Sequence, residues 1–593
     1  MTGHKWPNAA KLAAALAFSL AAVACDAAEG PRAVPTFHCI GLYWSPQEGG
    51  DDIVCRVRYR LVNSDEWKEA LPLWFDARGP EQHSQTLSNS SLGDGAPKPQ
   101  HEFARQYRGS IVNLAPGTEY DIELSLEGTE VRRRIKAKTW GEHFPIGKAV
   151  VLPETSHETL VIEQSGSPES YILYAPAPGK TATIDARNRI DHCVEINASY
   201  VIVRGLALKD ARSHAIRIID GHDIVIEECD ISGWGLPNAV QPEVWGKNME
   251  AAVYAREADP QNPTIERVIV QRCRVHHPRH DTNSWDEYRK EKDPEKKDYR
   301  WHPGGPQFVT MYNTRGNHVF RYNEVWSDAE HYYNDILGGG SNYSAAGFPN
   351  RDSDIYGNRL ANCWDDAIES EGANCNVRIW GNHIDQTMVA IATAAAHVGP
   401  LYMWRNVAAR SRWAPMKTYD EDKRGPFLKA GSSEDFGGGR TYVFHNTLLQ
   451  PAPERGMTLP RGWRGGLSSS GGPILNHVSR NNILQVHRAE GSSVAEREGA
   501  SRDNDFDHDL YNGLIKAYGR EHEKHGIVGE PIYDPKNGPE EFALAPNSPG
   551  YDAGVRIPNF NDGFTGKAPD MGAHEAGTPP MEFGVNAYRG TRR

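Results

Sequence analysis

The chain contains one dense cluster of carboxylic acids, in the segment Trp364-Asp365-Asp366-Ala367-Ile368-Glu369-Ser370-Glu371. Neighbouring carboxylates raise one another's pKa, so that one can keep its proton as a general acid while another activates water. Carboxylate oxygens are also the ligands that Ca²⁺ prefers. The segment is therefore the leading candidate for acid–base chemistry or for cation binding.

The acidic cluster belongs to a repeat of short, β-branched apolar runs between about residues 200 and 490. The closest repeats, from Asn358 to Asn382 and from Asn382 to Asn406, are 24 residues apart. A repeat of this length, built from short strands, indicates a solenoid. Asparagine suits a strand corner because it tolerates the left-handed backbone region, and its amide can bond to the asparagines one coil above and below. One aligned position reads Cys229, Cys273, Asn323, Asn358, Asn382, Asn406, Asn446 and Asn482.

This pattern resembles the right-handed parallel β-helix of the pectin-lyase-like superfamily. The resemblance implies an all-β solenoid over residues 146–577, followed by a tail at residues 578–593. The segments at residues 547–554 and 569–575 resemble the closing region of many exported bacterial β-helix proteins.

Residues 34–140 have the alternating short strands of a small β-sandwich. The stretch Leu114-Ala115-Pro116-Gly117-Thr118-Glu119-Tyr120 resembles the tyrosine corner of fibronectin type III domains. We expect this domain to act as a packing partner or spacer, with direct carbohydrate binding as the alternative. Cys39 and Cys55 fall on neighbouring predicted strands and are candidates for a disulfide after export, whereas Cys229 and Cys273 are expected in the core.

The strand that carries the acidic cluster has a predictable orientation. Ile368 matches Ile391 one coil later, so it should point inward. Alternation then turns Asp365, Glu369 and Glu371 outward, and Asp366 inward unless the strand starts after it.

The preceding coil ends with Asn334-Asp335, and alignment places this pair beside Asp365-Asp366. Side chains on adjacent coils stand about 4.8 Å apart, and alternate residues on one strand about 6.7 Å apart. These spacings can provide the separations of about 5 Å or about 6.5–9.5 Å between carboxyl groups that retaining and inverting glycosidic cleavage require.

The arrangement resembles the site of polygalacturonase-type glycoside hydrolases, which have an Asn-Thr-Asp segment on one coil and an Asp-Asp pair on the next. The resemblance implies that Asp335 is the first catalytic carboxylate and that Asp365 and Asp366 are the pair, with no cofactor required. This chain lacks the Thr between Asn334 and Asp335, and it lacks the Gly-His-Gly and Arg-Ile-Lys segments of that family. The match is therefore to a constellation of residues.

Two other functions remain open. In β-helix polysaccharide lyases, a Lys, Arg or His removes the proton next to a uronic carboxylate, often with Ca²⁺. On that reading Glu369 and Glu371, with the Asp pair, would hold Ca²⁺, and the candidate bases are Arg405, Lys417, Lys429 and His331. The third reading is a glycan-binding or adhesive β-helix, in which the acidic cluster is a structural Ca²⁺ site or a solvated face.

Long insertions at residues 233–266, 278–306 and 411–440 leave the coils near the acidic cluster, and loops on a rigid stack commonly form the walls of a binding groove. Aromatic and basic side chains in and beside them are predicted to contact the substrate. They are His331, Trp301, His302, Trp364, Arg405, Trp413 and Lys417.

The formal net charge of −13 argues against nucleic acid as a partner and leaves a polysaccharide as the expected one. Residues 1–28 read as an export signal, with basic residues before the short apolar run Leu12–Ala24 and a small-residue cleavage site. Cys25 follows directly and could carry a lipid anchor, although Ala22 stands where lipoprotein signals usually have Leu. We therefore expect a monomer that is secreted or periplasmic, or else an outer-membrane lipoprotein.

Overall fold

The computed structural model contains strands and turns but no helix in its described part, and hence no helix long and apolar enough to cross a membrane there. The predicted export segment, including Cys25, lies outside that part. The described residues are 30–80, 103–236, 250–282, 304–328, 330–339, 345–394, 398–411, 425–431, 438–449, 464–469, 472–486, 491–537 and 542–589.

The N-terminal part is a β-sandwich of two antiparallel four-stranded sheets, as predicted. The hydroxyl of Tyr120 accepts a hydrogen bond from the Ala115 N–H at 2.9 Å, which is the contact expected of a tyrosine corner. One sheet contains β1 (Arg32–Pro35), β2 (Ile40–Trp44), β6 (Gln106–Ile111) and β5 (Trp74–Asp76). The other contains β4 (Lys68–Glu69), β3 (Cys55–Leu61), β7 (Glu119–Leu126) and β8 (Arg132–Lys138).

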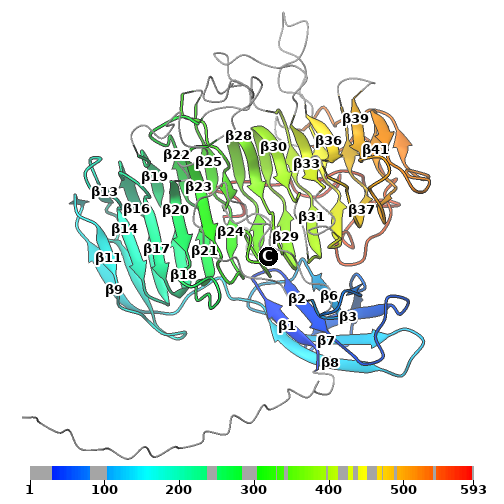
Figure 1. Cartoon of the computed structure of the whole chain (residues 1–593), viewed down its shortest axis with the longest axis horizontal. Helices are drawn as coiled ribbons and strands as arrows, with labels where there is room; N and C mark the ends of the chain where they lie inside the picture. Colours follow the sequence, from blue (N-terminus) through cyan, green and yellow to red (C-terminus); the bar gives the residue numbers. More distant parts are fainter. Residues whose placement is uncertain are drawn as a thin grey trace, which may run out of the picture.

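The rest of the chain winds into a parallel β-helix, in agreement with the predicted solenoid (Figure 1). One wall is a parallel sheet of 12 strands, and each of the eight aligned positions of the sequence repeat lies two residues after the end of one of these strands. In chain order the strands are β9 (Ile146–Leu152), β12 (Tyr171–Pro176), β15 (Val201–Arg204), β18 (His222–Glu227), β21 (Glu266–Gln271), β24 (Val319–Arg321), β27 (Asp354–Tyr356), β29 (Val377–Trp380), β31 (Leu401–Trp404), β34 (Thr441–Phe444), β37 (His477–Arg480) and β40 (Asp505–Phe506).

The second sheet has 23 strands, and its parallel pairings form two stacks that share β28 (Arg359–Glu369) and β30 (His383–Ala392). The first stack contains β10 (Thr155–Ser156), β13 (Ala182–Asp185), β16 (Leu206–Lys209), β19 (Asp230–Ser232), β22 (Arg274–His276), β25 (Glu324–Trp326), β32 (Val407–Ala408), β35 (Thr447–Leu448), β38 (Ile483–Leu484), β41 (Leu510–Tyr511) and β43 (Ile527–Val528). The second contains β11 (Leu160–Ile162), β14 (Val194–Asn197), β17 (Ile216–Asp220), β20 (Ala251–Arg256), β23 (Gln307–Tyr312), β26 (Leu337–Gly338), β33 (Pro426–Ala430), β36 (Gly465–Ser469), β39 (Ser492–Ala495) and β42 (Leu514–Lys516).

Apolar side chains fill the inside of the coils and form one continuous core, as expected for a solenoid whose coils bury surface only by stacking. Ile368 pairs with Ile391, as predicted from the sequence, and both are fully buried. The inward row to which they belong contains Val309, Leu337, Ile368, Ile391, Leu428, Leu467 and Val494.

A ladder of asparagines runs along one corner of the β-helix. The side-chain oxygen of Asn382 accepts both the main-chain N–H of Asn358, at 3.1 Å, and its amide, at 2.9 Å. The Asn382 amide donates in turn to Asn406 Oδ1 and to the Ile355 carbonyl. The hydrogen-bonding potential of these buried amides is therefore satisfied. The ladder contains Asn323, Asn358, Asn382, Asn406, Asn446 and Asn482, and it ends on Asp509, which the sequence alignment missed.

Of the two properties expected to favour asparagine at this corner, the hydrogen bonds between coils are confirmed and the left-handed backbone is not. The left-handed backbone conformation belongs to the residue before each ladder position, such as Gly357, Gly381 or Arg405, with φ values of 66°, 59° and 53°. Asparagine is needed for the hydrogen bonds between coils, and not for its backbone.

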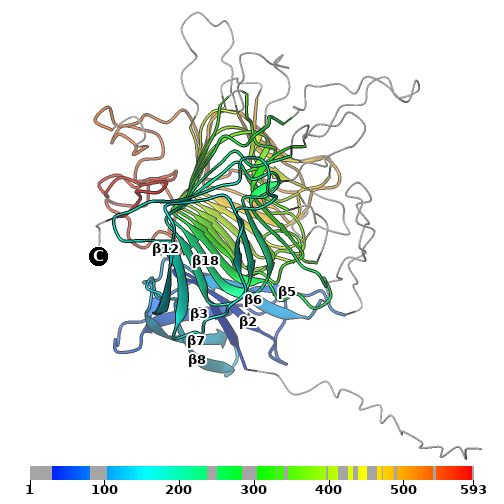
Figure 2. The same ribbon diagram turned by 90° about the vertical axis from the view of Figure 1, so that its left-hand side faces the viewer.

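The sandwich lies beneath the middle of the 12-stranded sheet (Figures 1 and 2). Polar contacts join the two at buried positions: Tyr43 donates to Asp352 at 2.7 Å, and Ser110 N–H donates to the Tyr402 hydroxyl at 3.0 Å. Arg378 and Asp354 form a fully buried ion pair at 2.6 Å beside this interface. The sandwich is thus a packing partner of the helix.

The predicted disulfide between Cys39 and Cys55 is not formed, because both cysteines are free and buried. Cys39 precedes β2 and packs in the cluster that faces the β-helix, whereas Cys55 begins β3 in the other sheet and points into the sandwich core. The two strands are not neighbours. Cys229 and Cys273 are buried in the helix core, as expected.

We expect Asn382→Ala to destabilise the protein, because it leaves the buried N–H and amide of Asn358 without their shared acceptor. Leaving buried donors unpaired costs about 2–4 kcal/mol in total, which thermal unfolding will show as a lower midpoint. Asn197→Ala, at an exposed position of β14, is the matched control. Equal midpoints for the two variants would contradict a structural role for the ladder.

Candidate functional site

The structure brings Asp335, Asp365 and Asp366 together from adjacent coils. The pairing of Leu337 with Ile368 places Asp335 beside Asp366, and the Asp366 N–H donates to Asp335 Oδ1 at 2.9 Å. One oxygen from each of the three carboxylates lies within 4.8 Å of the others. The alignment of the two segments made from the sequence is therefore correct in position, whereas the chemical roles remain a prediction.

An irregularity in β28 shapes this cluster. Between Cys363 and Asp366 the strand has one residue more than its partner β30 has between Thr387 and Val389. Such a bulge re-aims the side chains around it. Asp365 was expected to point outward and Asp366 inward, but both are at most 4 % exposed. Neither carboxylate is therefore open to solvent.

Asp335 is held by three donors. Besides the Asp366 N–H, its carboxylate accepts hydrogen bonds from Gln307 Nε2 at 3.0 Å and from Asn334 Nδ2 at 2.7 Å. Gln307 begins β23, one coil before Asp335, and sequence analysis did not identify it. The strand alignment that placed Asp335 beside Asp366 would also have found Gln307.

Lys429 supplies a cation to the cluster. Its ammonium lies 2.5 Å from Asp366 Oδ2 and 3.2 Å from Glu371 Oε1. Lys429 is in register with Glu369, which lies two coils before it, and Ala392 occupies the same position in the coil between them. We call this line of residues the outward row. Of the candidate bases named from the sequence, Lys429 is the one that contacts the carboxylates within the described residues.

Burial and like charge control the protonation of the cluster. Burial raises the pKa of Asp335 well above its usual range, and the charges of Glu369, Asp365 and Asp366 raise it further. Burial likewise raises the pKa of Asp366, although Lys429 counteracts part of that shift. Burial lowers the pKa of Lys429, but Asp366 and Glu371 outweigh this effect and bring the pKa well above its usual value. The surroundings thus favour the protonated form of Asp335 and Asp366 and the charged form of Lys429.

The residues predicted to hold Ca²⁺ also lie together, since Asp366, Glu369 and Glu371 each place one oxygen within 4.8 Å of the others. Hard carboxylate oxygens suit Ca²⁺. However, the ammonium of Lys429 already contacts two of these three carboxylates. A calcium ion would have to displace it, so the described contacts fit a lysine counter-ion better than a metal.

Other residues predicted to contact substrate are placed differently. Trp364 is fully buried against Tyr332, 5.1 Å between ring centroids, so it cannot present its face to a sugar. Arg405 lies at the corner of the asparagine ladder, where it donates to the Ala573 carbonyl at 2.7 Å, away from the carboxylates. His331 bonds to Asp328 at 2.8 Å and does not contact the carboxylates in the described structure. Trp301, His302, Trp413 and Lys417 lie outside the described residues, as does most of the three insertions.

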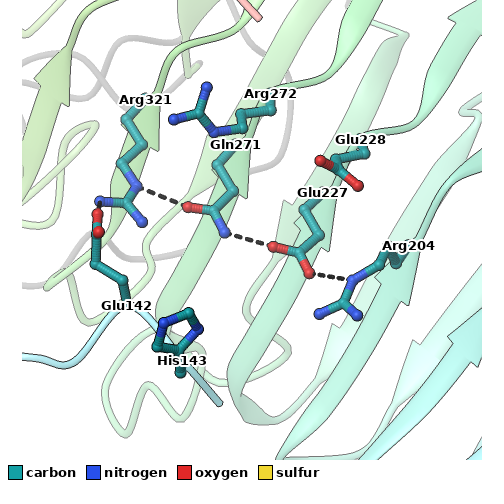
Figure 3. A pocket seen from close by; sticks show the side chains of 8 residues that line it. All are labelled: Glu142, His143, Arg204, Glu227, Glu228, Gln271, Arg272 and Arg321. Atoms are coloured by element: carbon teal, nitrogen blue, oxygen red, sulfur yellow. Dashed lines mark hydrogen bonds and ion pairs between the residues drawn. The ribbon is translucent and has the colours of Figure 1, made fainter. Parts of the chain in front are cut away.

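A second polar region lies on the outer surface of the 12-stranded sheet, around a cavity of about 300 Å³ (Figure 3). Successive coils contribute Arg204, Glu227, Gln271 and Arg321 to it. Hydrogen bonds of 2.5 Å, 2.5 Å and 2.6 Å join them in that order, and Glu142 from the linker completes the row at 3.0 Å from Arg321. We interpret this region as a structural ladder, since its side chains bond to one another.

No protein-family model matches the chain, and no curated protein matches it. Among solved structures, the Dettilon tailspike protein is 11% identical with a TM-score of 0.30, over 59% of this chain and 60% of that one. Jun a 1, the major allergen from cedar pollen, is 13% identical with a TM-score of 0.26, over 65% and 82% of the two chains. The catalytic domain of a GH87 alpha-1,3-glucanase in complex with nigerose is 8% identical with a TM-score of 0.22, over 80% and 90%. The parallel β-helix fold is shown by this chain's own strand pairing.

The raised pKa values predict how stability depends on pH. An unfolded Asp loses its proton near the usual value of 3.8, whereas Asp335 and Asp366 keep theirs in the folded state. Their contribution to stability is therefore complete below about pH 4 and is lost as the pH rises towards their folded pKa values. Thermal unfolding midpoints from about pH 4 to about pH 8 should fall less steeply for Asp335→Asn/Asp366→Asn than for the parent protein. Parallel curves would show that these carboxyls titrate normally.

Proposed function

We propose that this protein is an exported carbohydrate-active enzyme that hydrolyses a polysaccharide at the cluster of Asp335, Asp365 and Asp366. The observation that carries the proposal is the convergence of three buried carboxylates from adjacent coils, with oxygens within 4.8 Å of one another. Glycoside hydrolysis needs one carboxyl that is protonated and another that is ionised at the same pH.

The surroundings assign a role to each carboxyl. The causes that raise the pKa of Asp335 are burial and three negative neighbours, so Asp335 is the general acid that gives its proton to the oxygen of the departing sugar. Lys429 counteracts part of the rise in the pKa of Asp366 and has no such contact with Asp335 in the described structure, so Asp366 is the one of these two carboxyls that gives up its proton first and acts on the anomeric carbon or on water. Asp365 stays beside both and keeps the proton on Asp335 by its charge.

The substrate would approach from the row that contains Glu369 and Lys429. Lys429 is 21% exposed, the most open group of the cluster, and Gly338 and Ala392 flank Glu369 in neighbouring coils.

The lyase reading is the second candidate. It would use Ca²⁺ at Asp366, Glu369 and Glu371 and a neutral base, and Lys429 is the lysine in position for that role. The raised pKa of Lys429 keeps it protonated, which supports hydrolysis instead. The sandwich is proposed to be a fibronectin type III-like domain that supports the helix, and the helix a relative of the pectin-lyase-like proteins.

Screening the purified protein against acidic and neutral polysaccharides will test the proposal. We expect new reducing ends without the ultraviolet absorbance of an unsaturated uronate. That absorbance, with loss of activity after chelation, would establish the lyase. Binding without either product would establish a glycan-binding protein.

We expect Asp335→Asn and Asp366→Asn each to lower the rate of cleavage by about 100-fold or more, as removal of a general acid or base does. Asp328→Asn, which removes a half-exposed carboxylate paired with His331, should leave the rate nearly unchanged. Thermal midpoints measured in parallel will show that the variants are folded. Full activity in both cluster variants would refute the assigned chemistry.

The short separation of the carboxylates predicts the stereochemical outcome. One oxygen of each carboxylate lies within 4.8 Å of the others, which is nearer to the spacing of about 5 Å in retaining enzymes than to the about 6.5–9.5 Å between the carboxyl groups of inverting enzymes. Proton NMR of the first product formed should show the anomeric configuration of the substrate. The opposite anomer would mean that the reacting pair is more widely spaced.

A further inference from the structure

A second cluster of ligand-type side chains lies at the C-terminal end of the β-helix, where β41 marks the end of the stack in Figure 1. Asp507 and His508 directly follow β40, the last strand of the 12-stranded sheet. His525 directly precedes the glycine before β43, the last strand of the other sheet. The cluster thus connects the final strands of both sheets.

The three side chains converge on one point. One ligand atom from each lies within 4.8 Å of those of the other two. His525 Nδ1 is 2.8 Å from Asp507 Oδ2, and His508 Nε2 is 3.8 Å from the same oxygen. The two imidazoles are stacked with centroids 4.8 Å apart and planes 16° from parallel.

These distances are close to those of a zinc site. Zinc binds imidazole nitrogen and carboxylate oxygen at about 2.0–2.2 Å, so neighbouring ligand atoms of a tetrahedron are about 3.3 Å apart. The observed 2.8 Å and 3.8 Å lie on either side of this value. The two stacked rings would turn out of their parallel arrangement so that one nitrogen of each faces the ion. We propose that Asp507, His508 and His525 bind a divalent transition-metal ion of the zinc class, with the fourth position open to water.

The carboxylate is already oriented for this task. Asp507 Oδ1 accepts the main-chain N–H groups of His508, at 2.9 Å, and His525, at 2.7 Å, which leaves Oδ2 directed at the two rings. Such supporting hydrogen bonds fix the first ligands of natural metal sites. The nearby Arg480 and Arg520 both pair with Asp505, at 2.7 Å and 2.8 Å, and in the described structure the ion pairs of Asp507 are with the two histidines.

The ligand set selects the kind of metal. Imidazole suits zinc, copper and nickel, whereas Ca²⁺ and Mg²⁺ prefer oxygen ligands. A metal here would hold the segment before β43 against the end of β40 and so close the last coil. This role is independent of the proposed hydrolysis, and the side chain of His525, which is 56% exposed, leaves the site open to solvent.

The test uses the untagged full chain after treatment with a chelator. Calorimetric titration with Zn²⁺ should show one site, and Zn²⁺ should raise the midpoint of thermal unfolding, whereas Ca²⁺ should not. Co²⁺ should give the visible absorption of a four-coordinate site with nitrogen and oxygen ligands. His508→Ala and His525→Ala should each weaken Zn²⁺ binding by more than about tenfold.

His522→Ala is the matched control, since His522 belongs to the same segment but bonds to the Tyr518 carbonyl instead. Asp507→Asn provides a second variant if a histidine variant fails to fold, and it should also lose the Co²⁺ spectrum. Unchanged affinity in His508→Ala/His525→Ala, or no binding to the parent protein at micromolar Zn²⁺, would overturn the proposal. No step of the test needs a substrate, so its outcome is separate from that of the proposed function.

Discussion

The registration of each coil on the next is the constraint on which the rest of the molecule depends. Asp335 and Asp366 meet only because Leu337 pairs with Ile368, and a shift by one residue would exchange the inward and outward faces of the whole coil. The asparagine ladder fixes this register. From Asn358 onward each ladder oxygen accepts two hydrogen bonds from the coil before, so a displaced coil would leave several buried donors unpaired.

Two of the buried ionic groups in the described β-helix differ in how their charges are balanced. Asp354 and Arg378 are a balanced pair, with the guanidinium also bonded to Ser110 and to a carbonyl, beside the sandwich interface. The cluster at Asp366, by contrast, gathers five carboxyl groups, and Lys429 is the cation that its described contacts supply. Crowded like charges are unfavourable for folding, and such local conflicts are typical of functional sites that a stable scaffold supports.

Much of this arrangement could be predicted from the sequence, because the 24-residue period fixes which residues share a wall. The period placed Ile368 on Ile391 and, through the strand pattern, Asp335 beside Asp366. It placed Arg405 directly before the corner position Asn406, where the structure has it. It did not show that Lys429 belongs to the outward row, since the insertion at residues 411–440 obscures the register there. The period also could not predict which side chains are buried. The packing of Trp364 on Tyr332 and the separate surroundings of Cys39 and Cys55 do not depend on the spacing of residues in the sequence.

The aromatic rings of the β-helix bear on how a sugar would be recognised. Tyr356, Trp380 and Trp404 stack on one another at 4.1 Å and 4.6 Å along the outer face of the 12-stranded sheet, and Phe560 from the C-terminal segment covers Trp404. These rings line a cavity of about 1010 Å³ on that face and do not belong to the carboxylate cluster. Within the described residues, recognition beside the carboxylates therefore falls to charged and hydrogen-bonding groups such as Glu369 and Lys429. Such groups favour a sugar held by its polar substituents over one held by ring stacking.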